Sequence, residues 1–300
     1  MAQKRAVTVQ DISCFGKCSL TVALPIISAA GIEVAAIPTA VLSTHTGGFT
    51  GYTYRDLTDD ITQIAAHWKS LGLKFDAIYT GYLGAFEQLR LMGEFFDAFK
   101  GDGIVMIDPV MADNGILYGG FSPDFPAGMA KLCAKADLIA PNLTEAAFML
   151  GEPFIGDTYD STYIEALMKR LSALGPKQVV LTGVSFAPDK LGSACYDADT
   201  GKVDYYFNDR VPGYFHGTGD VFASALLSAV LRGKALPAAI KVATDFTLES
   251  IKRTAAAKIG GDLCRERFVE GNLIGQDHDR VPGEVGLRVD DVELVLAFLE

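Results

Sequence analysis

Short apolar segments with strand character alternate with longer segments of helical periodicity along most of this 300-residue chain. The predicted strands are Ala6–Gln10, Val34–Ile37, Ala77–Tyr79, Ile104–Ile107, Leu138–Ala140 and Val179–Leu181. The helical segments lie near Leu20–Ala30, Asp56–Ser70, Phe86–Phe99, Asp124–Ala134, Thr144–Leu150 and Thr162–Ala173. This alternation is typical of α/β proteins in which helices cover both faces of a sheet. We therefore predict a mostly parallel central sheet within one domain over residues 1–300.

The last third of the chain departs from this alternation. Ser193–Tyr196 and Val203–Phe207 flank the turn-forming stretch DADTGK, which predicts a small antiparallel hairpin at the edge of the sheet. A helix is expected from Val221 to about Leu231, and the last helix over Val289–Leu299. Residues 260–288 are rich in glycine and charge, so we expect them to form a mobile surface segment.

Composition excludes several classes of partner. The net charge is −11, which argues against nucleic acid and against an anionic membrane surface as partners. The apolar stretch 19–42 is interrupted by Pro25, Gly31 and Pro38, so a helix followed by a strand explains it better than a membrane span. Five scattered cysteines show no zinc spacing and fit a reducing compartment. We expect a soluble, cytoplasmic protein.

Polar residues follow each predicted strand. In α/β folds, ligands bind beyond the carboxyl ends of the strands, so these residues are expected to share one rim. In chain order they are Asp11, STHTGG (43–48), TGYLG (80–84), DPVMADNG (108–115), PNLTE (141–145) and TG (182–183). The stretch HGTGD (216–220) is expected to join them.

Within HGTGD, Gly217, Thr218 and Gly219 form the leading turn of the predicted helix. Glycines leave backbone N–H groups unobstructed, and a helix N-terminus carries partial positive charge, so the turn is a candidate anion site. An ordinary helix cap by Thr218 or Asp220 fits the fragment better when it is taken alone.

Three acidic residues also fall on the rim: Asp108, Asp113 and Glu145. Carboxylate oxygens suit Mg²⁺, which is commonly held through one or two carboxylates together with substrate phosphates. The alternatives are a strand-ending turn at Asp108 and a first-turn helix carboxylate at Glu145. No P-loop or dinucleotide fingerprint accompanies them. Together with an anion-binding turn, the three carboxylates favour a phosphoryl-transfer site.

The ordered set STHTGG, TGYLG, DPVMADNG, PNLTEA and HGTGD resembles the vitamin-kinase branch of the ribokinase superfamily over nearly the whole chain. GTGD alone is typical of the superfamily, whereas TGYLG with DPVMADNG is typical of its pyridoxal kinases. The resemblance implies a ribokinase-like fold, ATP and Mg²⁺ as cofactors, and a homodimer. It also implies phosphorylation of the 5-hydroxymethyl group of a vitamin B6 vitamer, which means pyridoxal, pyridoxamine or pyridoxine.

The resemblance also implies roles for individual positions. Asp220 corresponds to the catalytic base that takes the proton of the substrate hydroxymethyl group, and Gly217, Thr218 and Gly219 correspond to the anion hole. The implied ATP contacts are Asn142, Thr182, Asp113 and Glu145, and the implied metal positions are Asp108, Asp113 and Glu145. The implied substrate-binding positions are Asp11, His45, Thr46 and Tyr82, and residues 112–120 correspond to a flap over ATP.

One departure keeps the substrate open. Many pyridoxal kinases have Gln-Ser-His where this chain has Gln10-Asp11-Ile12, and an Asp at this position is reminiscent of hydroxymethylpyrimidine kinases of thiamine biosynthesis. Many of those enzymes carry Cys where this chain has Asp220. A third alternative is a non-catalytic ligand-binding protein on the same fold, which the presence of Asp220 disfavours.

Overall fold

A nine-stranded, mostly parallel sheet runs through the computed structural model, which describes residues 3–47, 49–213, 215–256 and 297–298. Six neighbouring strands are parallel, in the spatial order β9 (Gln178–Val184), β8 (Leu138–Ile139), β5 (Ile104–Ile107), β4 (Ala77–Thr80), β1 (Arg5–Ser13) and β2 (Glu33–Leu42). Antiparallel strands complete both edges: β10 (Lys190–Asp197) and β11 (Lys202–Asp209) beside β9, and β3 (Tyr54–Asp56) beside β2. The predicted α/β class, parallel sheet and edge hairpin are confirmed.

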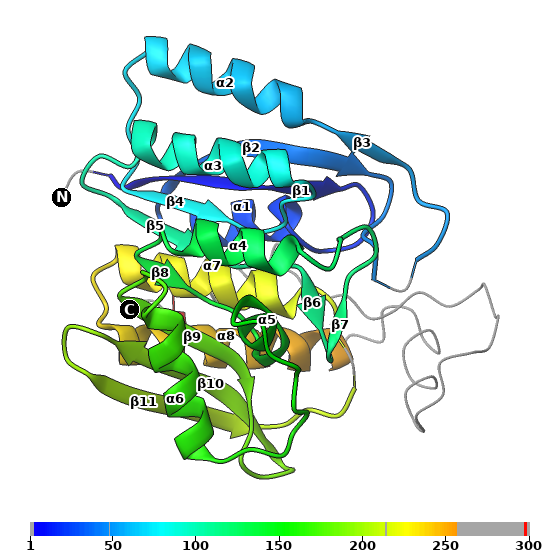
Figure 1. Cartoon of the computed structure of the whole chain (residues 1–300), viewed down its shortest axis with the longest axis vertical. Coiled ribbons are helices and arrows are strands. Elements are labelled where there is room, and N and C mark those ends of the chain that lie inside the picture. Colours follow the sequence, from blue (N-terminus) through cyan, green and yellow to red (C-terminus); the bar gives the residue numbers. More distant parts are fainter. Residues whose placement is uncertain (1–2, 48, 214, 257–296, 299–300) are drawn as a thin grey trace.

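Helices cover both faces of this sheet (Figure 1). One face carries α2 (Thr58–Ser70), α3 (Phe86–Phe99), α4 (Phe125–Cys133), α5 (Leu143–Met149) and α6 (Ser161–Ser172). The opposite face carries α1 (Leu20–Ala29), α7 (Thr218–Leu231) and α8 (Leu236–Ala256). None of the helices in the described ranges is both long and apolar enough to cross a membrane.

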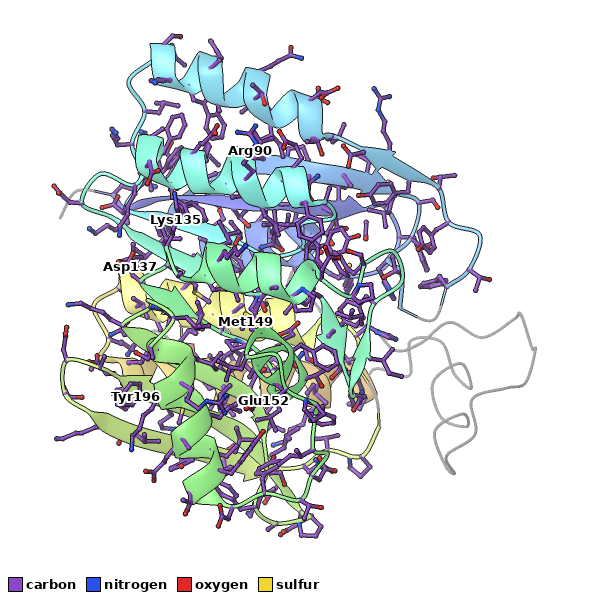
Figure 2. All side chains as sticks on the ribbon, viewed as in Figure 1. Arg90, Lys135, Asp137, Met149, Glu152 and Tyr196 are labelled. Carbon is purple, nitrogen blue, oxygen red and sulfur yellow. The ribbon has the colours of Figure 1, made fainter. Side chains whose placement is uncertain are left out.

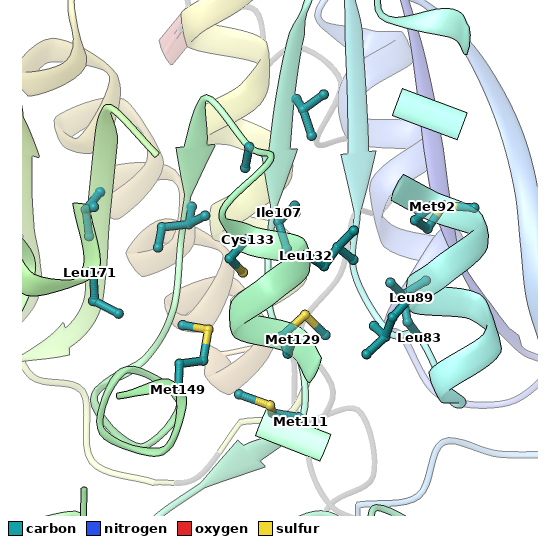
Figure 3. Close-up of a cluster of buried hydrophobic side chains, with 14 of the residues drawn as sticks. Leu83, Leu89, Met92, Ile107, Met111, Met129, Leu132, Cys133, Met149 and Leu171 are labelled. Carbon is teal, nitrogen blue, oxygen red and sulfur yellow. The ribbon is translucent and has the colours of Figure 1, made fainter. Parts of the chain in front are cut away.

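The core consists of two apolar layers, one on each face, because successive strand residues point to opposite sides. On β5, Val105 and Ile107 pack with the α3–α5 side, while Met106 between them packs with the α7–α8 side. Figure 3 shows part of the first layer, where Met129 of α4 lies between Leu89 of α3 and Met149 of α5. Burial of both faces explains why the parallel strands read as continuous apolar runs.

The ion pairs of the described residues lie outside these layers, on surface helices, strands and connecting loops. In Figure 2, Arg90 on α3 points to the surface, where it pairs with Glu87. The Arg170 guanidinium binds the Glu152 carboxylate through two hydrogen bonds of 2.9 and 2.6 Å. Water screens such exposed pairs strongly, so the apolar layers dominate the stability of the fold.

Several predicted boundaries are wrong near the carboxyl ends of the strands. Strand β1 continues to Ser13 and β9 continues to Val184, so Asp11 and Thr182 lie inside strands rather than after them. Pairing with β2 explains the extension of β1, because Ser13 lies opposite Leu42 in the ladder. Polar residues at the end of a strand predict a loop, but hydrogen bonds to the neighbouring strand keep the backbone extended here.

The start of α7 also differs from the prediction. The helix begins at Thr218 with Gly217 as its N-cap, three residues before the predicted start at Val221. Apolar periodicity misses a first helical turn that is made of polar residues and glycine. Asp220 therefore lies within the first turn of the helix.

Two small elements were not predicted. Strand β3 ends at Asp56, where a helix start was expected. The hairpin of β6 (Ala112–Asp113) and β7 (Ile116–Leu117) turns at Asn114 and Gly115, whose φ angles of 50° and 77° are both left-handed. This backbone is that of a two-residue hairpin turn, for which Asn-Gly is the preferred sequence.

Some predictions concern the end of the chain. The predicted mobile segment 260–288 lies outside the described residues, as does the predicted helix Val289–Leu299 apart from residues 297–298. The single domain over residues 1–300 stays a prediction.

Candidate active site

A cavity of about 140 Å³ opens beyond the carboxyl ends of β5, β8 and β9, beside the first turn of α7. Its lining residues are Asp108, Val110, Tyr118, Ala140, Asn142, Glu145, Thr182, Gly217, Gly219, Asp220, Phe222 and Ala223. Residues far apart in the sequence thus meet at one edge of the sheet, as the rule for ligand sites in α/β folds predicts. The predicted acidic, nucleotide-contacting and anion-binding positions are largely brought together here.

The turn at the start of α7 has the geometry of an anion site. Gly217 adopts a left-handed backbone with φ 78°, and Thr218 and Gly219 begin the helix, where backbone N–H groups have no intrahelical acceptor. A Cβ atom placed on Gly219 would meet nothing within 4 Å. Packing therefore does not require glycine at this position, and its backbone faces open space in the cavity. Free N–H groups and the helix dipole together attract negative charge.

Asp220 is half-buried and borders the cavity. Its carboxylate accepts a 2.9 Å hydrogen bond from the Ser19 backbone N–H. Burial raises the pKa of Asp220 to about 7, against the opposing effect of the Ser19 bond, and the charge of Asp11 adds to the rise. A carboxylate whose pKa lies near neutrality is suited to accept a proton and release it again.

Asp108 and Glu145 form a second acidic pair, which lines the same cavity. The Asp108 side chain is buried, and no hydrogen bond from the described residues reaches its carboxylate. Burial first, and then the charges of Glu145 and Asp220, hold the pKa of Asp108 well above its usual range. A bound cation would relieve this unfavourable accumulation of charge.

Glu145 has a structural role as well. It is the third residue of α5, and its carboxylate accepts the Asn142 N–H at 2.9 Å and the Met111 N–H at 3.1 Å. The reciprocal bond from the Glu145 N–H to the Asn142 side chain, also 2.9 Å, completes a capping box. Burial raises the pKa of Glu145 in spite of these bonds. The alternative considered from the sequence, a first-turn helix carboxylate, is confirmed, and Glu145 lines the cavity at the same time.

The three predicted metal positions do not form a three-residue metal centre. Asp113 lies on β6, outside the set that lines the cavity, and accepts the Asn114 N–H at 2.9 Å. Among the described residues, no group of three or more metal-binding side chains is assembled. Mg²⁺ usually keeps several waters and needs only one or two protein carboxylates. Asp108, whose carboxylate has no hydrogen-bond donor in the described structure, and the adjacent Glu145 fit that requirement.

The predicted nucleotide-contacting positions Asn142 and Thr182 are neighbours, because Asn142, beyond the end of β8, forms a parallel bridge with Thr182 on β9. The Asn142 amide donates to the Ala112 carbonyl at 2.8 Å, which connects the cap of α5 to the β6–β7 hairpin. Tyr118 follows that hairpin and lines the cavity. The predicted flap, 112–120, therefore borders the site.

The predicted substrate positions form a second group, separate from the residues that line the cavity. Asp11 is buried on β1 and accepts a 2.9 Å hydrogen bond from the Ser13 hydroxyl. Burial raises the pKa of Asp11, although hydrogen bonds from the Ser19 and Ser13 side chains lower it. Burial is the main cause that raises the pKa of Tyr82. The charge of Tyr54 and then that of Asp11 raise it further, so Tyr82 lies close to Asp11.

Aromatic rings form the walls of this region. The Tyr82 ring centroid lies 5.6 Å from that of Phe121, just after the flap. The His45 ring lies 5.0 Å from the His216 ring and 4.8 Å from the Phe49 ring. Thr46, the remaining predicted position, is half-buried in the loop that follows His45.

Sequence reasoning missed several side chains of this region. Tyr54 lies on the unpredicted strand β3. Its hydroxyl lies so close to Gly84 that a Cβ atom added to that glycine would be only 2.5 Å away. The Ser19 N–H binds Asp220, but nothing in the local sequence of Ser19 marks it. His216 was within reach, because it directly precedes Gly217 in the HGTGD motif.

Comparisons with known proteins identify related vitamin kinases. The profile of the phosphomethylpyrimidine kinase family matches residues 24–263. A Bacteroides thetaiotaomicron protein with a provisional name as a phosphomethylpyrimidine kinase, crystallised in an orthorhombic form with pyridoxal, is 38% identical, with a TM-score of 0.80 over 84% of this chain and 88% of that chain.

Two further relatives carry vitamin B6 names. Pyridoxal kinase from Lactobacillus plantarum is 31% identical, with a TM-score of 0.82 over 98% of this chain and 97% of that chain. A pyridoxine/pyridoxal/pyridoxamine kinase from Bordetella avium is 26% identical over 269 residues, which cover 84% of this chain and 86% of the relative.

Proposed function

The chain belongs to the phosphomethylpyrimidine kinase family, and on that premise we propose that it is an ATP-dependent kinase that phosphorylates the 5-hydroxymethyl group of a vitamin B6 vitamer. Relatives named for pyridoxal, or crystallised with it, support this substrate class. The observation that carries the proposal is the position of Asp220. It borders the cavity beside the anion turn, and its carboxylate is held by the Ser19 N–H.

Each part of the site has a role in this proposal. Asp220 accepts the proton of the substrate hydroxymethyl group, while the N–H groups of residues 217–219 hold the transferring phosphoryl group. Mg²⁺, when bound, neutralises charge on the ATP phosphates, and Asp108 and Glu145 would hold it largely through water. The aromatic ring of Tyr82 offers a wall for a flat substrate ring. Most of the catalytic effect then comes from positioning and from charge stabilisation.

Asp11 is expected to select among ring substrates. A buried carboxylate prefers a ligand that presents a donor, and a bond to a cation is stronger than one to a neutral group. The pyridinium N–H of a vitamer, or the ammonium group of pyridoxamine, meets that need. Pyridoxamine should therefore compete well with pyridoxal, and Asp11→Ser should shift the preference toward pyridoxal.

A second candidate is a hydroxymethylpyrimidine kinase, which the family assignment and Asp11 both favour. Asp220 in the GTGD motif supports the B6 substrate instead. A non-catalytic binding protein on the same fold is the third candidate, and ATP turnover alone distinguishes it from the other two.

The test is substrate-dependent ADP production with pyridoxal, pyridoxamine, pyridoxine, hydroxymethylpyrimidine or no acceptor, in the wild type and in Asp11→Ser. We expect the highest kcat/KM with a B6 vitamer. If the pyrimidine is preferred by about tenfold, a difference of about 1.4 kcal/mol in transition-state binding, the B6 assignment fails. If no acceptor stimulates ADP production, the binding protein remains.

Two further parts of the proposal concern the oligomeric state and the cellular location of the protein. The resemblance to pyridoxal kinases supports a homodimer, which light scattering on the purified chain tests directly. Cys14, Cys18, Cys133 and Cys195 are free thiols, which supports a reducing, cytoplasmic location.

A further inference from the structure

Gln88 is a polar side chain on the buried face of α3, where it is fully shielded from solvent. Glutamine is seldom buried completely, because an unpaired amide costs free energy in an apolar interior. The Gln88 amide oxygen accepts the Gly84 N–H at 2.8 Å. Its amide nitrogen donates to the Thr39 carbonyl and to the Thr58 hydroxyl, each at 3.0 Å. One side chain therefore connects α3 with β2, with the start of α2 and with the loop that follows β4.

An ordinary helix cap does not account for these bonds. Ala85 is the N-cap of α3, so Gln88 occupies the position from which a capping box would bind the Ala85 N–H. Gln88 instead binds the N–H of Gly84, which lies one residue before the cap. The bond therefore holds the loop as well as the end of the helix.

Thr39 holds the same loop from β2. Its side chain is wholly buried, and its hydroxyl donates to the Tyr82 carbonyl at 3.0 Å. The Thr39 carbonyl accepts the Leu57 N–H at 3.1 Å as well as the Gln88 amide, so Thr39 is itself fixed in place. The Tyr82 carbonyl and the Gly84 N–H, two residues apart, are thus both bound by buried side chains.

The loop is closely packed around these two bonds. A Cβ atom added to Gly84 would lie 2.5 Å from the Tyr54 hydroxyl and 3.3 Å from the Tyr82 hydroxyl, so both phenol groups lie against the Gly84 backbone. Leu83 is buried in the same apolar layer as Leu89 (Figure 3). Tyr82 is half-buried by comparison. Any shift of the loop would therefore move the Tyr82 ring relative to its surroundings.

We propose that Thr39 and Gln88 are positioning residues of the kinase: together they fix the loop 81–84 so that the Tyr82 ring forms a rigid wall of the substrate region. Both act through Tyr82, since their own side chains are wholly buried. A wall that is already ordered loses less freedom when a ring binds against it, which strengthens binding. The inference rests on the proposed function, in which Tyr82 faces the ring substrate.

Thr39→Val tests the bond to Tyr82. Valine has nearly the shape of threonine and favours strands, so it removes the hydroxyl with little change in packing. The KM for the ring substrate that the wild type prefers should rise about five- to tenfold, as expected for the loss of one buried hydrogen bond. Both kcat and the KM for ATP should stay within about twofold, because binding lost equally from ground state and transition state raises KM alone. An unchanged KM for the ring substrate, or an equal rise in the KM for ATP, overturns the proposal.

Two controls separate this bond from general damage. Thr39→Ser keeps the hydroxyl and loses only a methyl group, so it should keep the wild-type KM for the ring substrate. Thr244→Val removes another buried hydroxyl, which donates to the Ile240 carbonyl at 2.8 Å on α8, across the sheet from α3. It should leave that KM unchanged as well. If either control raises the KM as much as Thr39→Val does, the proposal is overturned.

Gln88→Met tests the second residue, and it carries the test if Thr39→Val fails to fold. Methionine is similar in length and favours helices, and the Thr39 carbonyl keeps its bond from the Leu57 N–H. The same rise in the KM for the ring substrate is expected. In a Tyr82→Ala background, either substitution should change this KM by less than about twofold, because both act through Tyr82. Full additivity overturns the proposal, and melting temperatures identify any variant that fails to fold.

The activity of the wild type distinguishes this inference from the function on which it rests. If the wild type turns over none of the ring substrates, the proposed function is refuted. Turnover by the wild type together with an unchanged KM in Thr39→Val and Gln88→Met refutes only the positioning role.

Discussion

Replacing Gly219 by alanine should stabilise the protein and impair the reaction. Gly219 is the second residue of α7, and a Cβ atom built there meets nothing within 4 Å, so alanine introduces no clash. Glycine within a helix is less favourable than alanine by about 0.5–1 kcal/mol. At this early helical position we expect a gain of about 0.5 kcal/mol, which corresponds to a rise of about 1–2 °C in the Tm of a chain of this size.

The effect on the reaction should have the opposite sign. Gly219 lines the cavity, so its new methyl group would occupy space that we assign to the transferring phosphoryl group. Loss of one donor to developing negative charge typically costs about 10²–10³ in kcat, and displacement of the phosphoryl group from the turn should cost a similar factor. The assay is ADP production with saturating Mg²⁺ and ATP, alongside thermal unfolding.

Gly93→Ala provides a matched control on α3. There the added Cβ would meet only the flexible end of Lys135, at 3.3 Å, and Gly93 does not line the cavity. This variant should keep its activity. If Gly219→Ala is stable and retains kcat/KM within about threefold, the start of α7 does not hold phosphate. If it is markedly destabilised, the glycine serves the fold instead.

Three other outcomes are expected. Asp220→Asn should lower kcat by about 10²–10⁴ with little change in Tm, because its amide oxygen can still accept the Ser19 N–H but cannot act as a base; near-normal turnover would make Asp220 a simple helix residue. In the wild type, kcat/KM should fall as the pH is lowered through about 7, since protonated Asp220 cannot accept the hydroxyl proton, and a flat profile from pH 5 to 8 would contradict this assignment. Glu145→Gln should raise the Mg²⁺ concentration needed for half-maximal rate, and full activity in excess chelator would refute the metal assignment.

Much of the fold could be predicted because the core is strongly patterned. Helix α3 and strand β5 begin and end at the predicted residues, Phe86–Phe99 and Ile104–Ile107. Both are apolar enough for periodicity and burial to agree. Predictions failed where tertiary pairing decides the backbone, as at Ser13, which remains extended because β2 lies beside it.

The site could be predicted at the level of which residues meet, because the carboxyl ends of parallel strands share one edge. That rule brought Asp108, Thr182 and Asp220 to one cavity from distant parts of the sequence. It could not distinguish Asp113, which the β6–β7 turn carries outside the cavity lining. It could not find Ser19 either, since a left-handed serine is fixed by the partners around it rather than by its own sequence.

The acidic character of this site explains how a chain with a net charge of −11 can accept a polyanionic substrate. Asp108 and Glu145 are buried together, and burial and neighbouring charge raise the pKa of Asp108, so this part of the cavity repels a free anion once the carboxylates are ionised. In the proposed site, phosphate is attracted instead by the N–H groups at the start of α7, which carry no net charge and act only at short range. Such a site favours ATP that arrives with its cation over free ATP, because the cation neutralises the same carboxylates that would otherwise oppose binding. In this proposal, the acidic residues and the anion turn are therefore complementary halves of one site.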